Sequence, residues 1–313
     1  MIDFQYLATG VYGLANAQRA GTMAGHLGAA VVAGYFFGED QSELAEPVFR
    51  GIEGELERVI AGEESFWWNA RKAGVTPADL FEPLPQEAPE ADGIGTIVDA
   101  LQKNAGETRQ SGHNIIFASL AIRALREHAE FATPRVVAGV RKLTEGFNNA
   151  HAGRGYYGKQ QGWLTGNQVK LAPDETFAPY RSVQEMADTT VAELLASAAV
   201  KKQGFGGLWH IINHAAAITE MDRFGYKQLV ARALPAHHQH IRLWRSLPDV
   251  ESELGPMIKA DHDPREPAYW QGMLKRDEAQ LTHRIKTLFG YYTLKRYIED
   301  EAKQKQADEA FLY

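Results

Sequence analysis

Histidines at the start of apolar, helix-like segments are the residues of this 313-residue chain with the clearest capacity for chemistry. His26 and His113 each follow a glycine, and each heads a run of small or aliphatic side chains; His210 and His283 lie at the start of similar runs. The helix dipole disfavours a protonated histidine at a helix N-terminus, so we expect neutral imidazoles that can act as bases or metal ligands. If these helices lie side by side, four histidines meet in one cavity.

His210 and His214 are four residues apart, which places them one turn apart on the same face of a helix. This spacing can hold a metal ion between two imidazoles, as in the zinc-protease helix motif. Residue 211 is isoleucine, where that motif has its glutamate general base, so we do not expect peptide hydrolysis. We take His26, His113, His210 and His214 as candidate catalytic residues, and His210 with His214 as candidate ligands of one divalent metal ion.

Each of these histidines also has a simpler interpretation, because a lone histidine inside an apolar helix is often a hydrogen-bonded core residue. His237, His238 and His240 follow Pro235, and we interpret them as a solvated cluster at a helix kink. Glu63, Glu64 and the Trp67–Trp68 pair either line the mouth of a pocket or pack in the core.

The segment 151–181 is the longest stretch without helical periodicity, and a loop of this length is usually functional or mobile. Its glycine-rich part contributes four candidate substrate-binding residues that would form a lid over the cavity: Arg154, Tyr156, Tyr157 and Trp163. An exposed, inert loop is the alternative. The segment lacks the Gly-Lys-Ser/Thr ending of a phosphate-binding loop, so we expect no nucleotide cofactor.

Composition narrows the classes of partner. The chain carries 33 Lys and Arg against 40 Asp and Glu, for a formal net charge of -7, and no long basic run. This balance argues against binding to nucleic acid or to an anionic membrane surface. Because the chain has no cysteine, any metal must be held by histidine, carboxylate or main-chain oxygen. The start of the chain lacks the basic and apolar parts of a signal peptide, and we expect a cytoplasmic protein.

The elements that must position these residues are helices, because apolar residues recur with helical rather than strand spacing. We predict one all-α domain over 1–313, with an acidic, proline-rich linker at 82–92 and the loop at 151–181. A unit of histidine helix, reversal and amphipathic helix recurs as a degenerate repeat. We also predict that a helix starts after Ser42, that Pro235 kinks or breaks its helix, and that residues 301–310 are frayed.

Helical hairpins with a histidine near the start of the inner helix, as at Gly25-His26, Gly112-His113 and Trp209-His210, resemble the α/α-toroid proteins. The segments His113–Leu125 and His214–Ile218 are similar to those of the questin-oxidase-like family. The first resemblance implies inner helices that surround a central pocket. The second implies oxidation of an aromatic or polyketide-like substrate.

The sequence therefore predicts an enzyme that acts on a small organic molecule in a central pocket, through histidine acid–base chemistry or a histidine-bound metal ion. An oxidoreductase, a lyase and an isomerase all remain open, and the chain can form oligomers. The alternative is a non-catalytic binding or scaffold protein of helical repeats whose histidines are core residues.

Overall fold

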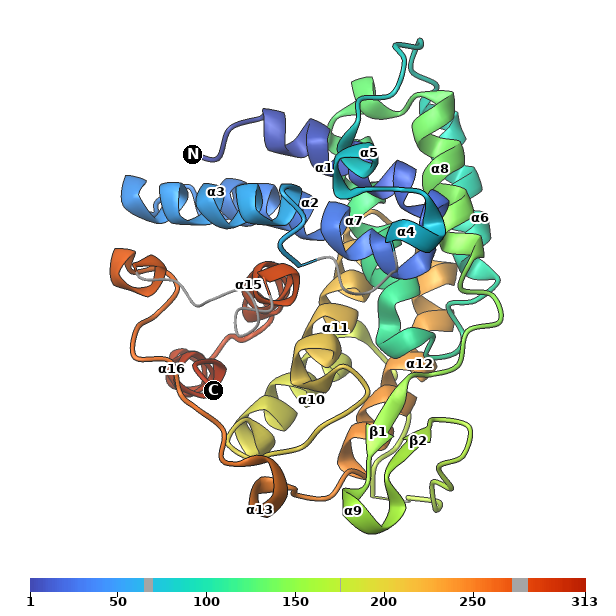
Figure 1. The fold of residues 1–313 in the computed structure, drawn as a ribbon. Helices are drawn as coiled ribbons and strands as arrows, with labels where there is room; N and C mark the ends of the chain where they lie inside the picture. The colour runs from blue at the N-terminus through green and yellow to red at the C-terminus, as the bar shows by residue number, and fades with distance from the viewer. Residues whose placement is uncertain (65–69, 175, 272–280) are drawn as a thin grey trace. The chain divides into compact units, whose positions relative to one another are not determined.

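The computed structural model describes residues 1–64, 70–174, 176–271 and 281–313, which are predominantly helical (Figure 1). Within these ranges the only sheet is a hairpin in which β1 (Arg154–Tyr156) pairs antiparallel with β2 (Trp163–Thr165). The predicted all-α class is confirmed. The hairpin and the short helix α9 (Gly158–Gln161) between its strands lie in the segment expected to be a loop.

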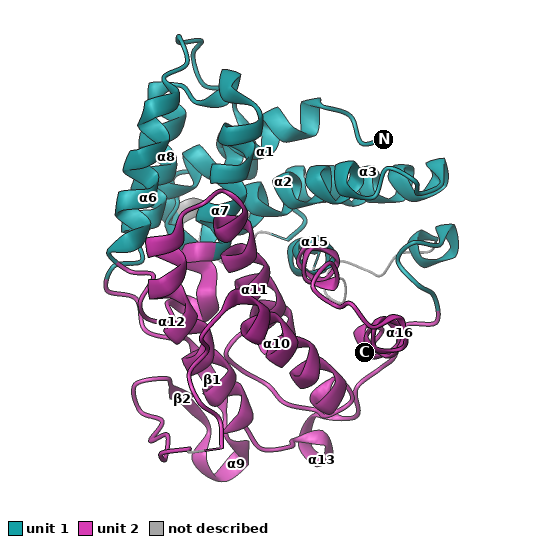
Figure 2. Ribbon diagram, turned by 180° about the vertical axis from the view of Figure 1, so that it is seen from behind, with its two compact units in different colours: residues 1–103, 116–148, 262–289 teal, residues 104–115, 149–261, 290–313 magenta. Residues whose placement is uncertain are grey.

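The chain forms two compact units (Figure 2). Unit 1 comprises residues 1–103, 116–148 and 262–289, and unit 2 comprises residues 104–115, 149–261 and 290–313. Each unit is thus assembled from three separate stretches of chain. Two helices, α7 (His113–Glu127) and α15 (Leu281–Lys295), contribute residues to both units.

Unit 1 is built around helix α2 (Gly25–Asp40), which is buried on every side along most of its length, as expected of a central helix. Helix α2 packs against α1 (Gln5–Asn16) and α3 (Glu46–Ile60). The other described elements that lie wholly in unit 1 include α8 (Pro134–Glu145), which packs on α1 and α6. The rest are η1 Ala17–Arg19, η2 Thr22–Ala24, α4 Ala70–Ala73, α5 Pro77–Phe81, η3 Ala91–Gly93, α6 Ile94–Gln102, η5 Ala129–Phe131 and η6 Pro267–Trp270. The segment 82–92 leads from α5 into η3.

Glycines set the close crossing of α1 and α2. A Cβ at Gly28 would lie 2.3 Å from the backbone nitrogen of Leu14, and one at Gly10 would lie 2.8 Å from that of Val32. No larger residue fits at this distance, because backbone atoms cannot move aside as a side chain can. The small residues of α2 therefore let the neighbouring helix approach closely.

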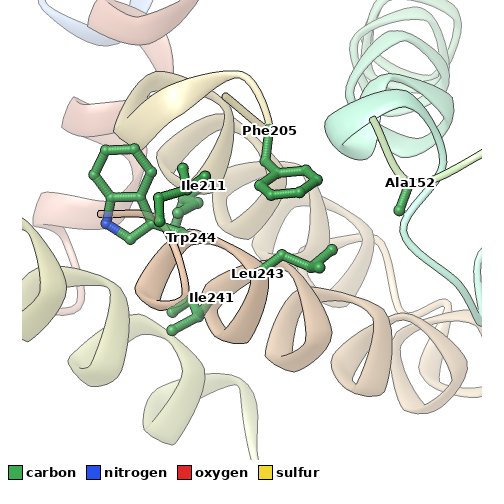
Figure 3. Packing of buried hydrophobic residues seen from close by; sticks show 7 residues of the cluster. Ala152, Phe205, Ile211, Ile241, Leu243 and Trp244 are labelled. Atoms are coloured by element: carbon green, nitrogen blue, oxygen red, sulfur yellow. The ribbon is translucent and has the colours of Figure 1, made fainter. Parts of the chain in front are cut away.

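Unit 2 is a helical assembly in which α10 (Val183–Ser197), α11 (Gly207–Arg223) and α12 (Lys227–Arg245) pack on one another. The remaining elements that lie wholly in unit 2, besides the hairpin and α9, are η4 Gln110–Gly112, α13 Glu251–Leu254 and α16 Glu301–Phe311. Residues from α11, α12 and the adjoining loops form an apolar cluster (Figure 3): Ala152, Phe205, Ile211, Ile241, Leu243, Trp244 and Leu247.

Helix α3 begins at Glu46 with Pro47 in its first turn, rather than after Ser42 as predicted, because proline is well suited to the first turn of a helix. Pro235 does not break its helix, since α12 continues through it; a kink at this residue stays a prediction. Leu234 and Ala236 on either side of the proline are buried, and this packing compensates for the hydrogen bond that proline cannot make.

The C-terminal segment is also more ordered than predicted, since residues 301–311 form helix α16. Asp300 accepts hydrogen bonds from the first backbone N–H groups of this helix, and the ring of Phe311 stacks on Tyr291 at 4.0 Å between centroids. Asp308 forms an ion pair with Lys295 at 2.7 Å. These contacts fix both ends of a helix whose polar composition had indicated fraying.

Candidate metal-binding histidines

His26 is fully buried near the start of α2, directly after the 3-10 turn η2. Its Nδ1 lies 2.7 Å from the carbonyl oxygen of Met23. A carbonyl only accepts hydrogen bonds, so Nδ1 carries the proton and the Nε2 of the neutral ring keeps its lone pair. The Met23 carbonyl thus fixes the tautomer of His26 in which Nε2 can act as a base or metal ligand.

His113 repeats this arrangement at the first residue of α7, directly after the 3-10 turn η4. Its Nδ1 donates to the carbonyl of Gln110, again three residues earlier, so Nε2 is the nitrogen that carries the lone pair of the neutral ring. Histidines that bind metals commonly donate their second ring nitrogen to a carbonyl or carboxylate in this way. The predicted likeness of His26 and His113 therefore extends to the hydrogen bond that orients each ring.

In unit 1, His26 packs against His283 on α15, with 5.0 Å between ring centroids. The edge of Phe117 contacts the other side of His26, with 5.2 Å between centroids. A Cβ at Gly25 would lie 2.7 Å from the Phe117 ring, so glycine at this position admits the aromatic side chain. Two histidines distant in the sequence are therefore neighbours within this unit.

Glu64 and Lys286 extend the polar interior of unit 1. Glu64 is fully buried, its Oε2 accepts a hydrogen bond from the backbone N–H of Thr282, and its Oε1 lies 3.8 Å from His283 Nδ1. Burial raises the pKa of Glu64, although the hydrogen bond from Thr282 and the charge of Lys286 oppose this. Burial lowers the pKa of Lys286 to about 7, against the attraction of Glu64.

Burial also lowers the pKa of His283 well below its ordinary value, and the neighbouring Lys286 charge adds to this effect. His283 is therefore neutral at physiological pH, the form in which an imidazole can accept a proton or bind a metal ion.

In unit 2, His113 and His210 form a second pair, with 4.4 Å between ring centroids and an interplanar angle of 75°. Gly206, at the N-cap of α11, lies against the His210 ring, where a Cβ would be 2.1 Å from Nδ1. This glycine has a φ of 76°, a left-handed conformation that side chains disfavour. Both the space and the backbone conformation therefore require glycine beside His210.

His214 lies one turn after His210 but belongs to a different histidine group. Its Nδ1 lies 3.2 Å from Nδ1 of His240, and its ring centroid is 5.1 Å from that of His237. Burial lowers the pKa of His214 well below its ordinary value, and the nearby His237 and His240 lower it further. The structure thus groups His210 with His113, and His214 with the histidines of α12.

The prediction that His237, His238 and His240 are solvated is wrong, because all three are buried. His237 Nε2 donates to the carbonyl of Ile211 at 3.1 Å, and His238 Nε2 donates to that of Phe177 at 3.0 Å. Since α12 is not interrupted at Pro235, this face of the helix stays packed inside unit 2.

The four predicted substrate-binding residues lie on the hairpin and contact one another or other residues of unit 2. Tyr156 Oη donates to Glu253 at 2.8 Å, and Tyr157 Oη lies 2.7 Å from Ser246 Oγ. The guanidinium of Arg154 lies over the ring of Trp163, which is 46% exposed. Their part in binding a substrate stays a prediction.

Sequence reasoning overlooked Lys286, whose only signal was a lysine three residues after His283 on the same helix. Glu64 was singled out with Trp67 and Trp68, and these two tryptophans lie outside the described residues.

No protein-family model matches the chain, and neither does any curated protein or solved structure. The resemblance to the questin-oxidase-like family and the toroidal arrangement therefore stay predictions. Among the residues that the structure describes, no helix combines the length and the apolar character needed to cross a lipid bilayer.

Proposed function

We propose that two buried histidine pairs, His26 with His283 in unit 1 and His113 with His210 in unit 2, bind divalent transition-metal ions, and that the protein is a metal-dependent enzyme acting on a small organic molecule. The observation that carries this proposal is that, within each pair, a ring nitrogen of one histidine lies within 4.8 Å of a ring nitrogen of the other. Imidazole ligands suit zinc, copper, iron and nickel. An ion of this kind supplies Lewis-acid or redox chemistry when bound.

The local structure of each pair supports this assignment. The rings of His26 and His113 are oriented by backbone carbonyls through Nδ1, so that Nε2 is the nitrogen with the lone pair in both neutral rings. His214 does not belong to either pair, and its Nδ1 is directed at His240.

Lys286 gives the proposed enzyme a nitrogen that can change its protonation state near neutral pH. Its Nζ is buried, and among the described residues it has no hydrogen-bond partner. The amine lies one turn after His283 on α15, with the Phe117 ring 5.8 Å away. When neutral, it offers a lone pair for proton transfer. Oxidation of an aromatic molecule, the reaction that the family resemblance implies, is the class of activity to assay first.

Metal analysis tests the proposal directly. We expect the purified protein, loaded with Co²⁺ and desalted, to retain the ion in a stoichiometric amount. Replacing either histidine of a pair by alanine should reduce the amount retained. His262→Ala is the matched control, because the ring of His262 is half exposed and belongs to neither pair.

The Cu²⁺-loaded protein should show nitrogen hyperfine structure by electron paramagnetic resonance, which reports histidine ligation independently of activity. A folded wild-type protein that retains no transition metal would overturn the proposal. It would instead favour the scaffold alternative, in which the histidines are core residues.

A further inference from the structure

Two backbone turns in unit 2 precede the histidines of the His113–His210 pair, and residues of both turns have left-handed backbone conformations. In the turn before His113, Gln110 and Ser111 have φ values of 44° and 59°. In the turn before α11, Phe205 has a φ of 48°. Non-glycine residues rarely adopt this conformation because it is strained, so both turns persist only where surrounding contacts impose them.

The buried rings of His214 and His240 contact both turns. His214 packs against Gly112, where a Cβ would lie 2.8 Å from its Cγ. His240 Nε2 lies 2.7 Å from the carbonyl oxygen of Phe205. The two rings are joined by the 3.2 Å contact between their Nδ1 atoms. One end of this ring pair therefore touches the turn before His113, and the other end binds the turn before His210.

The Phe205 carbonyl, which accepts the last hydrogen bond of the series His214–His240–Phe205, determines which nitrogen of each ring carries the proton. The Phe205 carbonyl can only accept, so His240 Nε2 carries a hydrogen and its Nδ1 is the unprotonated nitrogen of a neutral ring. His214 Nδ1 must then carry the hydrogen that it donates to His240. The interaction is directional, and only one pair of neutral tautomers satisfies it.

We propose that His214 and His240 are positioning residues that hold the turns before His113 and His210 in place, and so preorganise these two rings to bind a metal ion. The inference rests on the proposed function for its metal readout. Its structural content, the fixed geometry of the His113–His210 pair, stands independently. The inference thus gives His214, one turn after His210 on α11, a role in shaping the site rather than in binding the ion.

A substitution series separates the hydrogen bond from the bulk of the ring. His214→Leu removes the donor, and His214→Asn places an amide N–H near the position of Nδ1. His238→Leu is the matched control. It removes a buried histidine of α12 whose ring binds the carbonyl of Phe177 rather than either turn. We expect the Co²⁺ dissociation constant to rise about 10–100-fold in His214→Leu, the usual effect of losing an outer-shell partner.

The same constant should stay within a few-fold of wild type in His214→Asn and His238→Leu, with unchanged far-ultraviolet circular dichroism in all three variants. If His214→Leu binds Co²⁺ as tightly as the control, or if His214→Asn binds it as weakly as His214→Leu, the positioning role is wrong.

Nuclear magnetic resonance of the metal-free protein tests the inference even if no ion binds. Long-range proton–nitrogen spectra of the imidazoles should show His214 protonated at Nδ1 and His240 at Nε2. The ring signals of His113 and His210 should shift or broaden in His214→Leu and stay unchanged in His238→Leu. The opposite tautomers, or unaffected His113 and His210 signals, would overturn the inference whether or not the wild-type protein binds a metal.

Discussion

Buried neutral histidines should make unit 2 lose stability in mild acid. Burial lowers the pKa of His237 to about 3 and that of His240 to about 4, and the rings are fully enclosed. An unfolded histidine titrates near pH 6.5. Between that value and about 4 the unfolded chain binds protons that the folded chain does not, so the free energy of unfolding decreases as the pH falls.

The size of the effect follows from the two pKa values. Between about pH 7.5 and about pH 5, each ring should contribute a loss of about 2 kcal/mol, or about 4 kcal/mol together. The pKa of His214 is also lowered, and its protonation acts in the same direction. A loss of this size is a large fraction of the stability of a typical folded protein.

Urea unfolding followed by circular dichroism at a series of pH values measures this loss. Glutamine keeps a donor near the position of Nε2 but does not titrate, so His237→Gln and His240→Gln should each remove about 2 kcal/mol of the pH dependence. His262→Gln, at a half-exposed position, should leave the pH dependence unchanged. If both buried-site variants keep the full wild-type dependence, these rings do not stay neutral in the folded protein and the reasoning fails.

Two further predictions concern packing and charge in unit 1, and both are measured by urea unfolding at neutral pH. Gly28→Ala should destabilise the protein by about 1–3 kcal/mol, because its Cβ meets the α1 backbone, whereas Gly54→Ala, in open space on α3, should stabilise it by about 0.5–1 kcal/mol. Arg123 is buried and binds both oxygens of Asp40, at 2.8 and 2.9 Å, so Arg123→Ala should cost about 3 kcal/mol by removing this bidentate ion pair together with the packing of the arginine side chain. Arg135→Ala, in an exposed ion pair, should cause no measurable change. Equal effects within either matched pair would contradict the packing or the charge argument.

Helix positions and their apolar faces could be read from the sequence, because periodicity and small residues are local signals. The Gly-His starts at Gly25-His26 and Gly112-His113 belong to this class, since their orienting hydrogen bonds come from carbonyls only three residues earlier. The burial of His240 could not be read in this way, because it depends on α12 continuing through Pro235 and packing on α11.

Contacts between residues from distant parts of the chain could not be predicted from the sequence either. Glu64 meets Thr282 and His283 across more than two hundred residues, and no local pattern signals that pairing. The lowered pKa of Lys286 likewise depends on burial, which follows from tertiary packing rather than from the residues beside it. The sequence could thus propose single histidines but not the neighbours that tune them.

Because each unit consists of stretches that alternate along the chain with those of the other, few fragments of the protein can fold on their own. The chain passes from one unit to the other at 103/104, 115/116, 148/149, 261/262 and 289/290, and two of these passages fall inside the continuous helices α7 and α15. No contiguous fragment consists of one unit alone. Truncations at these points should yield insoluble or partly folded products rather than independent domains. Circular permutants that keep both helices intact are the variants that should retain the fold.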